Sequence, residues 1–413
     1  LRDTTGPEID PSQSGGQELS FGVVRLPLQS LEVMIRCVYR PLLEKDHPRI
    51  WGKATEEQRK EFVASLETYL RRLQEHIRSL TGGLELRKPD ARMESSAALE
   101  DPALISSAIH LLEEWCFRIT AYLEDSDRSQ WETGDSGPET ELQYWRGRMQ
   151  RLTSITEQLK SKACKCVIVL LNASVRVHNP LVDNECAAVL LARWRDLDVH
   201  ITEALNEAKD NVKYLSTLER FFEVLYGTDL KAILDSIPSL MNALKMIHTI
   251  ARYFSTTERM TRLFMKVTNQ MIHACKLALS GGENTDRLWD VDTTTLLDTM
   301  ELCLRINEEY QVQYRATKQS LLTLPKGKQF DFSESQIFGR FELFCRRILK
   351  LLDIFSAIQQ FAYLKQHKLE GIEPLLQSFS DTIRRFRGRG HNLLDYKDNR
   401  FDQHFLELST EMS

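Results

Sequence analysis

The chain has 413 residues, of which 42% are hydrophobic and 27% charged, so a sizeable core is expected and extensive disorder is not. Its formal net charge of −5 argues against a general nucleic-acid-binding protein, which would need a basic face. No apolar run approaches the roughly 20 residues that cross a bilayer, so no membrane partner is expected. The 8 scattered cysteines favour a reducing compartment.

Gly, Ser, Pro and acidic residues dominate residues 1–18, which are predicted to form a disordered leader. The chain does not begin with Met, and we therefore expect it to be a portion of a longer protein. Amphipathic helices follow over residues 19–125. Thr55 and Gln58 have the spacing of a capping box, and Asp101 followed by Pro102 predicts a second helix start.

Two apolar stripes at helical spacing mark the helices of residues 19–125. A cluster of about 100 residues has a limited core, so these stripes are candidate partner interfaces. The alternative is that the two stripes face one another in a closed bundle. Residues 126–140, rich in Gly, Ser, Pro and acids, are predicted to link this cluster to the rest. The stripes consist of Leu66, Leu70, Leu73 and Ile77, and of Leu111, Trp115 and Ile119.

The longest helical pattern covers residues 190–225, where apolar residues recur every three or four positions and neither Pro nor Gly interrupts. This predicts a single helix of roughly 35 residues. The pair Ile237-Pro238 is expected to begin the next helix. Residues 255–258 (STTE) read as a capping box for a further helix, with Ser255 as its first residue, and Gly281 is expected to end that helix.

Further helices are predicted over residues 296–324 and 337–371. No stretch alternates long enough to build a sheet, and no period of 20–50 residues indicates a regular solenoid. The predicted fold is therefore all-α: an elongated stack of helical bundles with long amphipathic helices and no sheet. Residues 141–413 would form the main series of bundles.

Motifs for catalysis are missing from the sequence. The pair Gly327-Lys328 lacks both the first Gly and the Ser or Thr of a phosphate-binding loop. The pair Cys164 and Cys166 lacks the spacing of a zinc site, and His248 is read as a structural helix residue. No catalytic, cofactor-binding or metal residue is assigned. A basic cluster at residues 384–389 could meet an acidic partner or a tubulin tail, or simply be a solvated helix end.

Several separate blocks, in order, resemble the N-terminal tail of dynein heavy chains. They include DNVKYL at residues 210–215, IPSLMNALKMI at 237–247, YFSTTERMT at 253–261 and KVTNQMI at 266–272. The last block resembles axonemal outer-arm heavy chains of the gamma type. The residues that carry the family's structural motif are Trp145, Arg148, Asp210, Asn211, Lys213, Tyr214, Asn242, Lys266, Asn269 and Gln270.

The resemblance implies a non-catalytic tail that joins other dynein heavy chains, carries intermediate and light chains, and anchors the motor through a docking complex on the doublet microtubule of a cilium or flagellum. Residues 19–125 would be the heavy-chain association region, and residues 141–413 the first helical bundles of a tail that continues further. The ATP and Mg²⁺ sites of the parent motor would lie beyond residue 413. The alternatives are an unrelated helical scaffold, such as a tethering subunit or a spectrin-like rod, and the tail of a two-headed inner-arm dynein.

Overall fold

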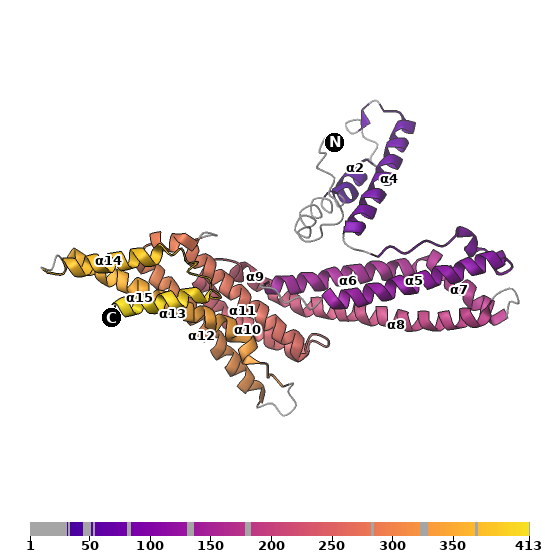
Figure 1. Ribbon diagram of the computed structural model, residues 1–413. Helices are drawn as coiled ribbons and strands as arrows, with labels where there is room; N and C mark the ends of the chain where they lie inside the picture. Colours follow the sequence, from indigo (N-terminus) through magenta and orange to yellow (C-terminus); the bar gives the residue numbers. More distant parts are fainter. Residues whose placement is uncertain are drawn as a thin grey trace. The chain divides into compact units, whose positions relative to one another are not determined.

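The computed structural model describes the chain in ten stretches: residues 31, 34–43, 51–52, 54–80, 84–129, 136–177, 183–281, 285–322, 329–367 and 371–412. Within these stretches the regular elements are helices and there is no strand, which confirms the all-α prediction (Figure 1). None of the described helices is both long and apolar enough to cross a membrane. The predicted leader, residues 1–18, lies outside the described residues.

Two compact units make up the chain, and their boundaries differ from the predicted domains. The first unit comprises residues 1–129 and 147–205, and the second comprises residues 130–146 and 206–413. Helix α5 (Pro102–Ser129) runs into the predicted linker 126–140 and belongs to the first unit together with residues from beyond that linker. The predicted cluster 19–125 is therefore not a separate body.

The first unit begins with a small helical hairpin. The π-helix η1 (Ile35–Tyr39) leads into α2 (Arg40–Leu43), and α4 (Glu56–Leu80) follows. The start of α4 confirms the predicted capping box: the Gln58 backbone N–H donates to Thr55 Oγ1 at 3.4 Å, and the Thr55 N–H donates to Gln58 Oε1 at 3.0 Å.

The Leu66–Leu73 stripe of α4 faces its own hairpin. Leu70 and Leu73 are buried against Ile35, with Leu31 and Leu66 packed beside them. The side chain of Ile77 lies outside the described residues. This core is small, and several large apolar side chains of the hairpin remain exposed: Met34, Val38, Tyr39, Leu42, Phe62 and Tyr69.

A larger core joins α5 to α6 (Pro138–Lys160), α7 (Lys162–Val177) and α8 (Asn184–Leu215). Leu111, Trp115 and Ile119 are all buried in it, and the Trp115 ring lies 6.3 Å from that of Trp194 on α8. The prediction that this stripe remains uncovered for a partner is wrong. The alternative that it faces the α4 stripe is wrong too, because α7 and α8 cover it.

The non-helical segment 84–90 is held against this core by side chains from two helices. Gln158 on α6 accepts from the Leu86 N–H at 2.8 Å and donates to the Leu84 carbonyl at 2.9 Å. Trp115 Nε1 donates to the Arg87 carbonyl at 3.0 Å. Extended backbone is thereby given the hydrogen-bond partners that it would otherwise lack.

The structure divides the predicted 190–225 helix into two helices. Helix α8 ends at Leu215, the 3-10 helix η4 (Ser216–Leu218) follows, and α9 (Glu219–Leu225) continues. Ser216 Oγ donates to the Lys213 carbonyl at 2.9 Å and Thr217 Oγ1 to the Tyr214 carbonyl at 2.7 Å. These local side-chain bonds compete with the α-helical ladder, which is why the helix tightens there.

Helix α10 (Leu230–Ile250) also begins earlier than predicted. Asp229 caps it by accepting from the Lys231 and Ala232 N–H groups, and Pro238 lies inside the helix. The next helix, α11 (Thr257–Ser280), is capped by Thr256, one residue after the predicted Ser255. Gly281 ends it with a φ of 62°, the left-handed conformation that glycine tolerates, as predicted.

Helices α12 (Thr293–Leu322) and α13 (Glu334–Gln366) complete the core of the second unit, with the short 3-10 helix η5 (Thr285–Asp290) before α12. Helix α10 packs on α12, and α13 packs on α11 and α12. The core is strongly aromatic. His248 lies 5.4 Å and 5.3 Å from the rings of Phe330 and Phe332, so it is a core histidine.

The last described helices are α14 (Glu373–Arg387) and α15 (Asn399–Met412). Arg347 on α13 anchors this part: Nη2 donates to the Asp398 carbonyl at 2.8 Å, and the guanidinium lies 3.8 Å from the Phe401 ring centroid. The basic cluster 384–389 is paired within the unit and is not a free cationic patch. Its ion pairs are Arg384–Asp381, Arg385–Glu411, Arg387–Asp290 and Arg389–Glu407.

A pair of histidines joins the loop before α15 to α15 itself. His391 Nε2 lies 2.6 Å from His404 Nδ1, a hydrogen bond that needs at least one neutral ring. Burial, and then the positive charge of His404, lower the pKa of His391 below its usual 6.5. The stability that this pair contributes is therefore present above about pH 6.5 and lost as the pH falls below it.

We expect α15 to loosen when the pH is lowered from about 7.5 to about 5.5, since the unfolded segment then binds more protons than the folded one. Hydrogen exchange of the amides of residues 399–411, corrected for the intrinsic pH dependence of exchange, measures this opening. His391→Asn, which removes the imidazole whose pKa burial lowers, is expected to flatten the pH response. An equal response in wild type and variant would contradict the role of the histidine pair.

Candidate functional site

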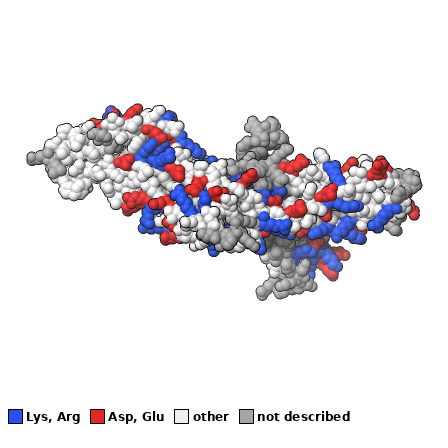
Figure 2. Space-filling view, turned by 90° about the horizontal axis from the view of Figure 1, so that it is seen from below, with Lys and Arg blue, Asp and Glu red and all other residues white. Residues whose placement is uncertain are grey.

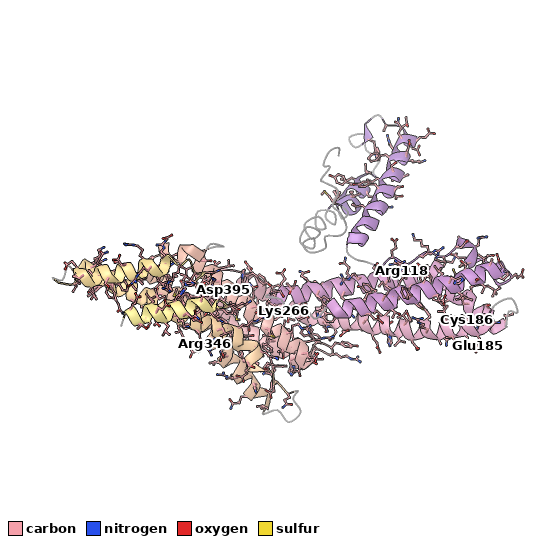
Figure 3. All side chains as sticks on the ribbon, in the orientation of Figure 1. Arg118, Glu185, Cys186, Lys266, Arg346 and Asp395 are labelled. Atoms are coloured by element: carbon pink, nitrogen blue, oxygen red, sulfur yellow. The ribbon has the colours of Figure 1, made fainter. Side chains whose placement is uncertain are left out.

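A buried ion pair lies at the centre of the polar residues that the sequence singled out. Lys266 on α11 is labelled in Figure 3. Its Nζ lies 2.8 Å from Glu141 Oε2 on the first turn of α6, and the two side chains are only 9% and 5% exposed. Nζ also donates to Thr140 Oγ1 at 3.1 Å. Both helical segments belong to the second unit. A charge this deeply buried is tolerated because a partner charge and a hydroxyl surround it.

The first turn of α6 orients the carboxylate. Glu141 and Trp145 are four residues apart and so share one side of the helix. Trp145 Nε1 donates to Glu141 Oε1 at 3.1 Å, which leaves Oε2 for Lys266. The Arg259 guanidinium lies 5.1 Å from the indole ring and pairs with Glu207 at 2.6 Å. The two ion pairs are thus joined through one tryptophan.

A close backbone approach at Gly137 brings the start of α6 against α9 and α11. A Cβ at Gly137 would lie 2.5 Å from the Tyr226 hydroxyl and 2.6 Å from Gln270 Oε1, so only glycine fits without a shift. Gln270 Nε2 donates to the Leu225 carbonyl at 3.1 Å, and the Tyr226 hydroxyl accepts from the Glu139 N–H at 3.3 Å. Burial raises the pKa of Tyr226, so its hydroxyl stays neutral.

Asp210 ties the end of α8 to the turn between α10 and α11. Its Oδ2 accepts from the Arg252 N–H at 3.0 Å and the Tyr253 N–H at 3.3 Å, two donors just past the end of α10. Asn211 is fully buried beside it, and its amide has no hydrogen-bond partner among the described residues. A buried amide without a hydrogen-bond partner costs stability.

The remaining motif residues do not join this cluster. Asn269 on α11 instead accepts from Arg340 Nη1 at 3.0 Å, and Arg148 is buried but falls in the first unit. Lys213 and Asn242 are exposed, and Tyr214 is half-buried. Of the motif residues predicted from the sequence, four lie in this cluster or beside it: Trp145, Asp210, Lys266 and Gln270.

Sequence reasoning missed Thr140, Glu207 and Arg259 as partners of this cluster. The spacing of Glu141 and Trp145 was a usable signal, because a carboxylate one turn before a tryptophan on a buried stripe needs a cation. Nothing local in the sequence identifies Lys266 as that cation, since the two residues are 125 positions apart.

The cluster is suited to holding helices together. Its carboxylates and cations are paired, and in the described stretches no group of three or more His, Cys, Asp or Glu residues is arranged to hold a metal ion. The buried thiols are equally unreactive: a hydrogen bond to Cys303 and burial raise the pKa of Cys275 well above its usual value. The geometry supports a mechanical role that fixes the start of α6, the end of α8, α9 and α11 relative to one another.

Comparison with known proteins confirms the resemblance to dynein heavy chains. Residues 105–413 match the family described as dynein heavy chain, N-terminal region 1. The chain is 36% identical over 97% of its length to the dynein gamma chain of the flagellar outer arm of Chlamydomonas reinhardtii. It is 35% identical over 85% of its length to mouse (Mus musculus) dynein axonemal heavy chain 5.

An inner-arm relative is more distant: the chain is 23% identical over 81% of its length to the dynein-1-alpha heavy chain of the Chlamydomonas reinhardtii I1 complex. The chain spans only 9%, 8% and 7% of the length of these three relatives. Because the family match covers most of the sequence, the possibility of an unrelated helical scaffold is excluded. The chain belongs to the dynein heavy chain family, and residues 105–413 lie in its N-terminal region.

Proposed function

We propose that this chain is the non-catalytic tail of an axonemal outer-arm dynein heavy chain of the gamma type. The observation that carries the proposal is the 36% identity over 97% of the chain to a flagellar outer-arm gamma chain, against 23% to an inner-arm chain. This difference favours the outer arm over the two-headed inner-arm alternative. We place the protein in the cytoplasm, where it is assembled, and in the axoneme of a cilium or flagellum.

In this role the tail assembles with other dynein heavy chains, carries intermediate and light chains, and anchors the motor through a docking complex on the doublet microtubule. Its helical bundles and internally paired charges support a scaffold that transmits force. ATP and Mg²⁺ would be bound by parts of the heavy chain beyond residue 413, and residues 1–413 would bind neither. Neither nucleic acid nor membrane is a partner in this proposal.

Removing residues 1–413 from the full-length heavy chain in ciliated cells tests the role directly. The truncated heavy chain is expected to keep ATP hydrolysis but to be missing from axonemes and to lose co-purification with intermediate chains. Incorporation of the truncated chain into outer arms at the wild-type level would refute the anchoring role. Loss of ATP hydrolysis in a soluble, folded truncated chain would refute the placement of the ATP sites.

The contact with a second heavy chain is proposed to lie on the N-terminal hairpin. We predicted the stripes Leu66–Ile77 and Leu111–Ile119 for this contact, but their described members face the interior of the first unit. The exposed apolar side chains of the same hairpin, such as Phe62 at 53% exposed, are better placed for it. We therefore keep the proposal that the N-terminal region binds a second heavy chain, and we assign the contact to the exposed face of the hairpin.

Phe62→Asp combined with Tyr69→Asp is expected to weaken binding of the whole chain to the partner heavy-chain tail by tenfold or more, about 1.4 kcal/mol. Both side chains are already exposed, so stability should change little beyond the loss of the edge-on contact between the Phe62 and Trp51 rings. Sedimentation velocity of the mixed tails gives the affinity. Val199→Asp, at a similarly exposed position on α8, is the control and should bind normally. Unchanged binding by the double variant would move the contact elsewhere.

A further inference from the structure

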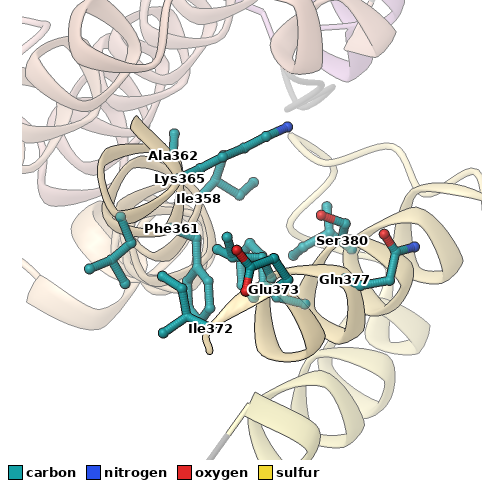
Figure 4. Close-up of a pocket in the computed structure, with 12 residues that line it drawn as sticks. Ile358, Phe361, Ala362, Lys365, Ile372, Glu373, Gln377 and Ser380 are labelled. Atoms are coloured by element: carbon teal, nitrogen blue, oxygen red, sulfur yellow. The ribbon is translucent and has the colours of Figure 1, made fainter. Parts of the chain in front are cut away.

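An apolar groove of about 680 Å³ lies between the last turns of α13 and the first turns of α14 (Figure 4). Its floor is formed by Phe361 and Phe379, whose rings stack 3.8 Å apart. Among the described residues of its lining, the charged ones are Lys365 and Glu373. Figure 2 shows few charged side chains on one face of this end of the second unit, at the left of the view. The other apolar residues of the lining are Ile358, Ala362, Leu364, Ile372, Leu376 and Ile383.

On α13 the groove continues the side of the helix that already binds α15. Lys350 Nζ lies 2.7 Å from Asp402 Oδ1 and 5.6 Å from the Phe405 ring of α15. Ile358 and Phe361 follow Lys350 at eight and eleven positions, which places them on the same side of α13, two and three turns further on.

On α14 the groove likewise continues the side that binds α15. Thr382 Oγ1 lies 3.3 Å from Glu411 Oε2, and Arg385 pairs with the same carboxylate at 2.7 Å. Phe379 precedes Thr382 by three positions and so lies on the same side of the helix. The two helices therefore form one trough, and α15 fills only part of it.

Helix α15 points along this trough towards its empty part. It runs antiparallel to α14, because Arg389 pairs with Glu407 while Arg385 pairs with Glu411. Prolonged as a regular helix, it would carry the residues roughly four to eleven beyond Ser413 over the part of α14 from Phe379 to Ile372. Helix α15 ends just where the groove begins.

We propose that the groove holds the helix that prolongs α15 beyond Ser413 in the full-length heavy chain. The relatives are roughly ten times longer than this chain, since it spans 9% of the gamma chain, so residues for such a helix are available in proteins of this family. The occupant would be amphipathic, with apolar residues every three or four positions towards Phe361 and Phe379. An acidic residue near Lys365 and a basic residue near Glu373 would complete the rim. This inference does not depend on which axonemal arm the protein serves.

The test compares residues 1–413 with a polypeptide of the same gene extended by about 30 residues, enough for a helix that spans the groove. Hydrogen exchange of the amides of residues 373–380 reports on the groove. Burial of even one leucine-sized side chain should slow this exchange by about tenfold or more in the extended chain. Equal exchange in the two polypeptides would overturn the proposal.

Two variants with the same added charge separate docking from folding. Ala362→Glu places a carboxylate in the groove, whereas Gln360→Glu places one on the exposed side of α13 outside the lining. Both should leave the melting temperature of residues 1–413 unchanged, because both positions are exposed. In the extended chain, Ala362→Glu should abolish the added protection and Gln360→Glu should retain it. Loss of protection in both variants, or in neither, would contradict the proposal.

The concentration dependence of the protection identifies a different occupant. Protection by the extension should be the same at about 1 µM and about 50 µM protein, because it is intramolecular (this range separates a dimer of micromolar affinity from an intramolecular contact). Protection of residues 1–413 alone that rises with concentration would assign the groove to a second copy of the chain and overturn the proposal.

Discussion

Replacing Lys266 by Met is expected to lower the free energy of unfolding of the second unit by about 3–5 kcal/mol. The substitution keeps most of the side-chain volume but leaves the Glu141 carboxylate, 5% exposed, without its counter-charge. The loss is mainly the cost of an unpaired buried charge and not the strength of the pair itself. Urea unfolding followed by circular dichroism measures the change.

A second substitution tests that explanation. Glu141→Gln removes the charge while keeping an amide oxygen for Trp145 Nε1, so the double variant should recover most of the stability that Lys266→Met loses. Lys60→Met, which breaks the exposed pair with Glu56, should leave the free energy of unfolding nearly unchanged. A double variant less stable than Lys266→Met would show that the charge is not what makes the site sensitive.

Replacing Trp115 by Ala is expected to destabilise the first unit by about 3–5 kcal/mol, because it opens a large cavity at a fully buried position. The indole also loses its contact with Trp194 and its hydrogen bond to the Arg87 carbonyl. The segment 84–90 should therefore become accessible to protease together with the loss of stability. Thermal unfolding and limited proteolysis follow the two effects.

Phe117→Ala provides the matched control, since this ring lies two residues later on the same helix but is 71% exposed. It should change stability by no more than about 0.5 kcal/mol. If Trp115→Ala instead left stability intact and weakened only the binding of a partner chain, the burial of the Leu111–Ile119 stripe within the first unit would be wrong.

Local features of this chain followed from its sequence because they depend on neighbours within one or two helical turns. The Thr55–Gln58 capping box, the helix start at Pro102 and the left-handed Gly281 each involve backbone groups at most four residues away. The apolar periodicity predicted helices throughout and no strand. The blocks of the central helices also identified the family correctly.

Some helix ends depend on tertiary packing as well as on local sequence signals. Pro238 is a sound helix start in isolation, yet α10 begins eight residues earlier, at Leu230, because burial of Leu230 and Ile233 stabilises the additional turns. Likewise, Ser216 and Thr217 bond to the backbone and split a stripe whose spacing alone predicts one helix.

Only the tertiary structure decided which helices pack against each apolar stripe. The Trp115 stripe is equally suited to a partner protein or to an internal helix, since burial rewards apolar area without regard to the identity of the neighbour. The pairing of Glu141 with Lys266 joins residues 125 positions apart, and its energy depends on the exclusion of water from both groups. The sequence by itself determined the all-α class, some of the helix caps and the family. The packing of the folded chain determined the remaining helix ends, the units, the buried ion pair and the faces left open, because exclusion of water is a property of the assembled helices.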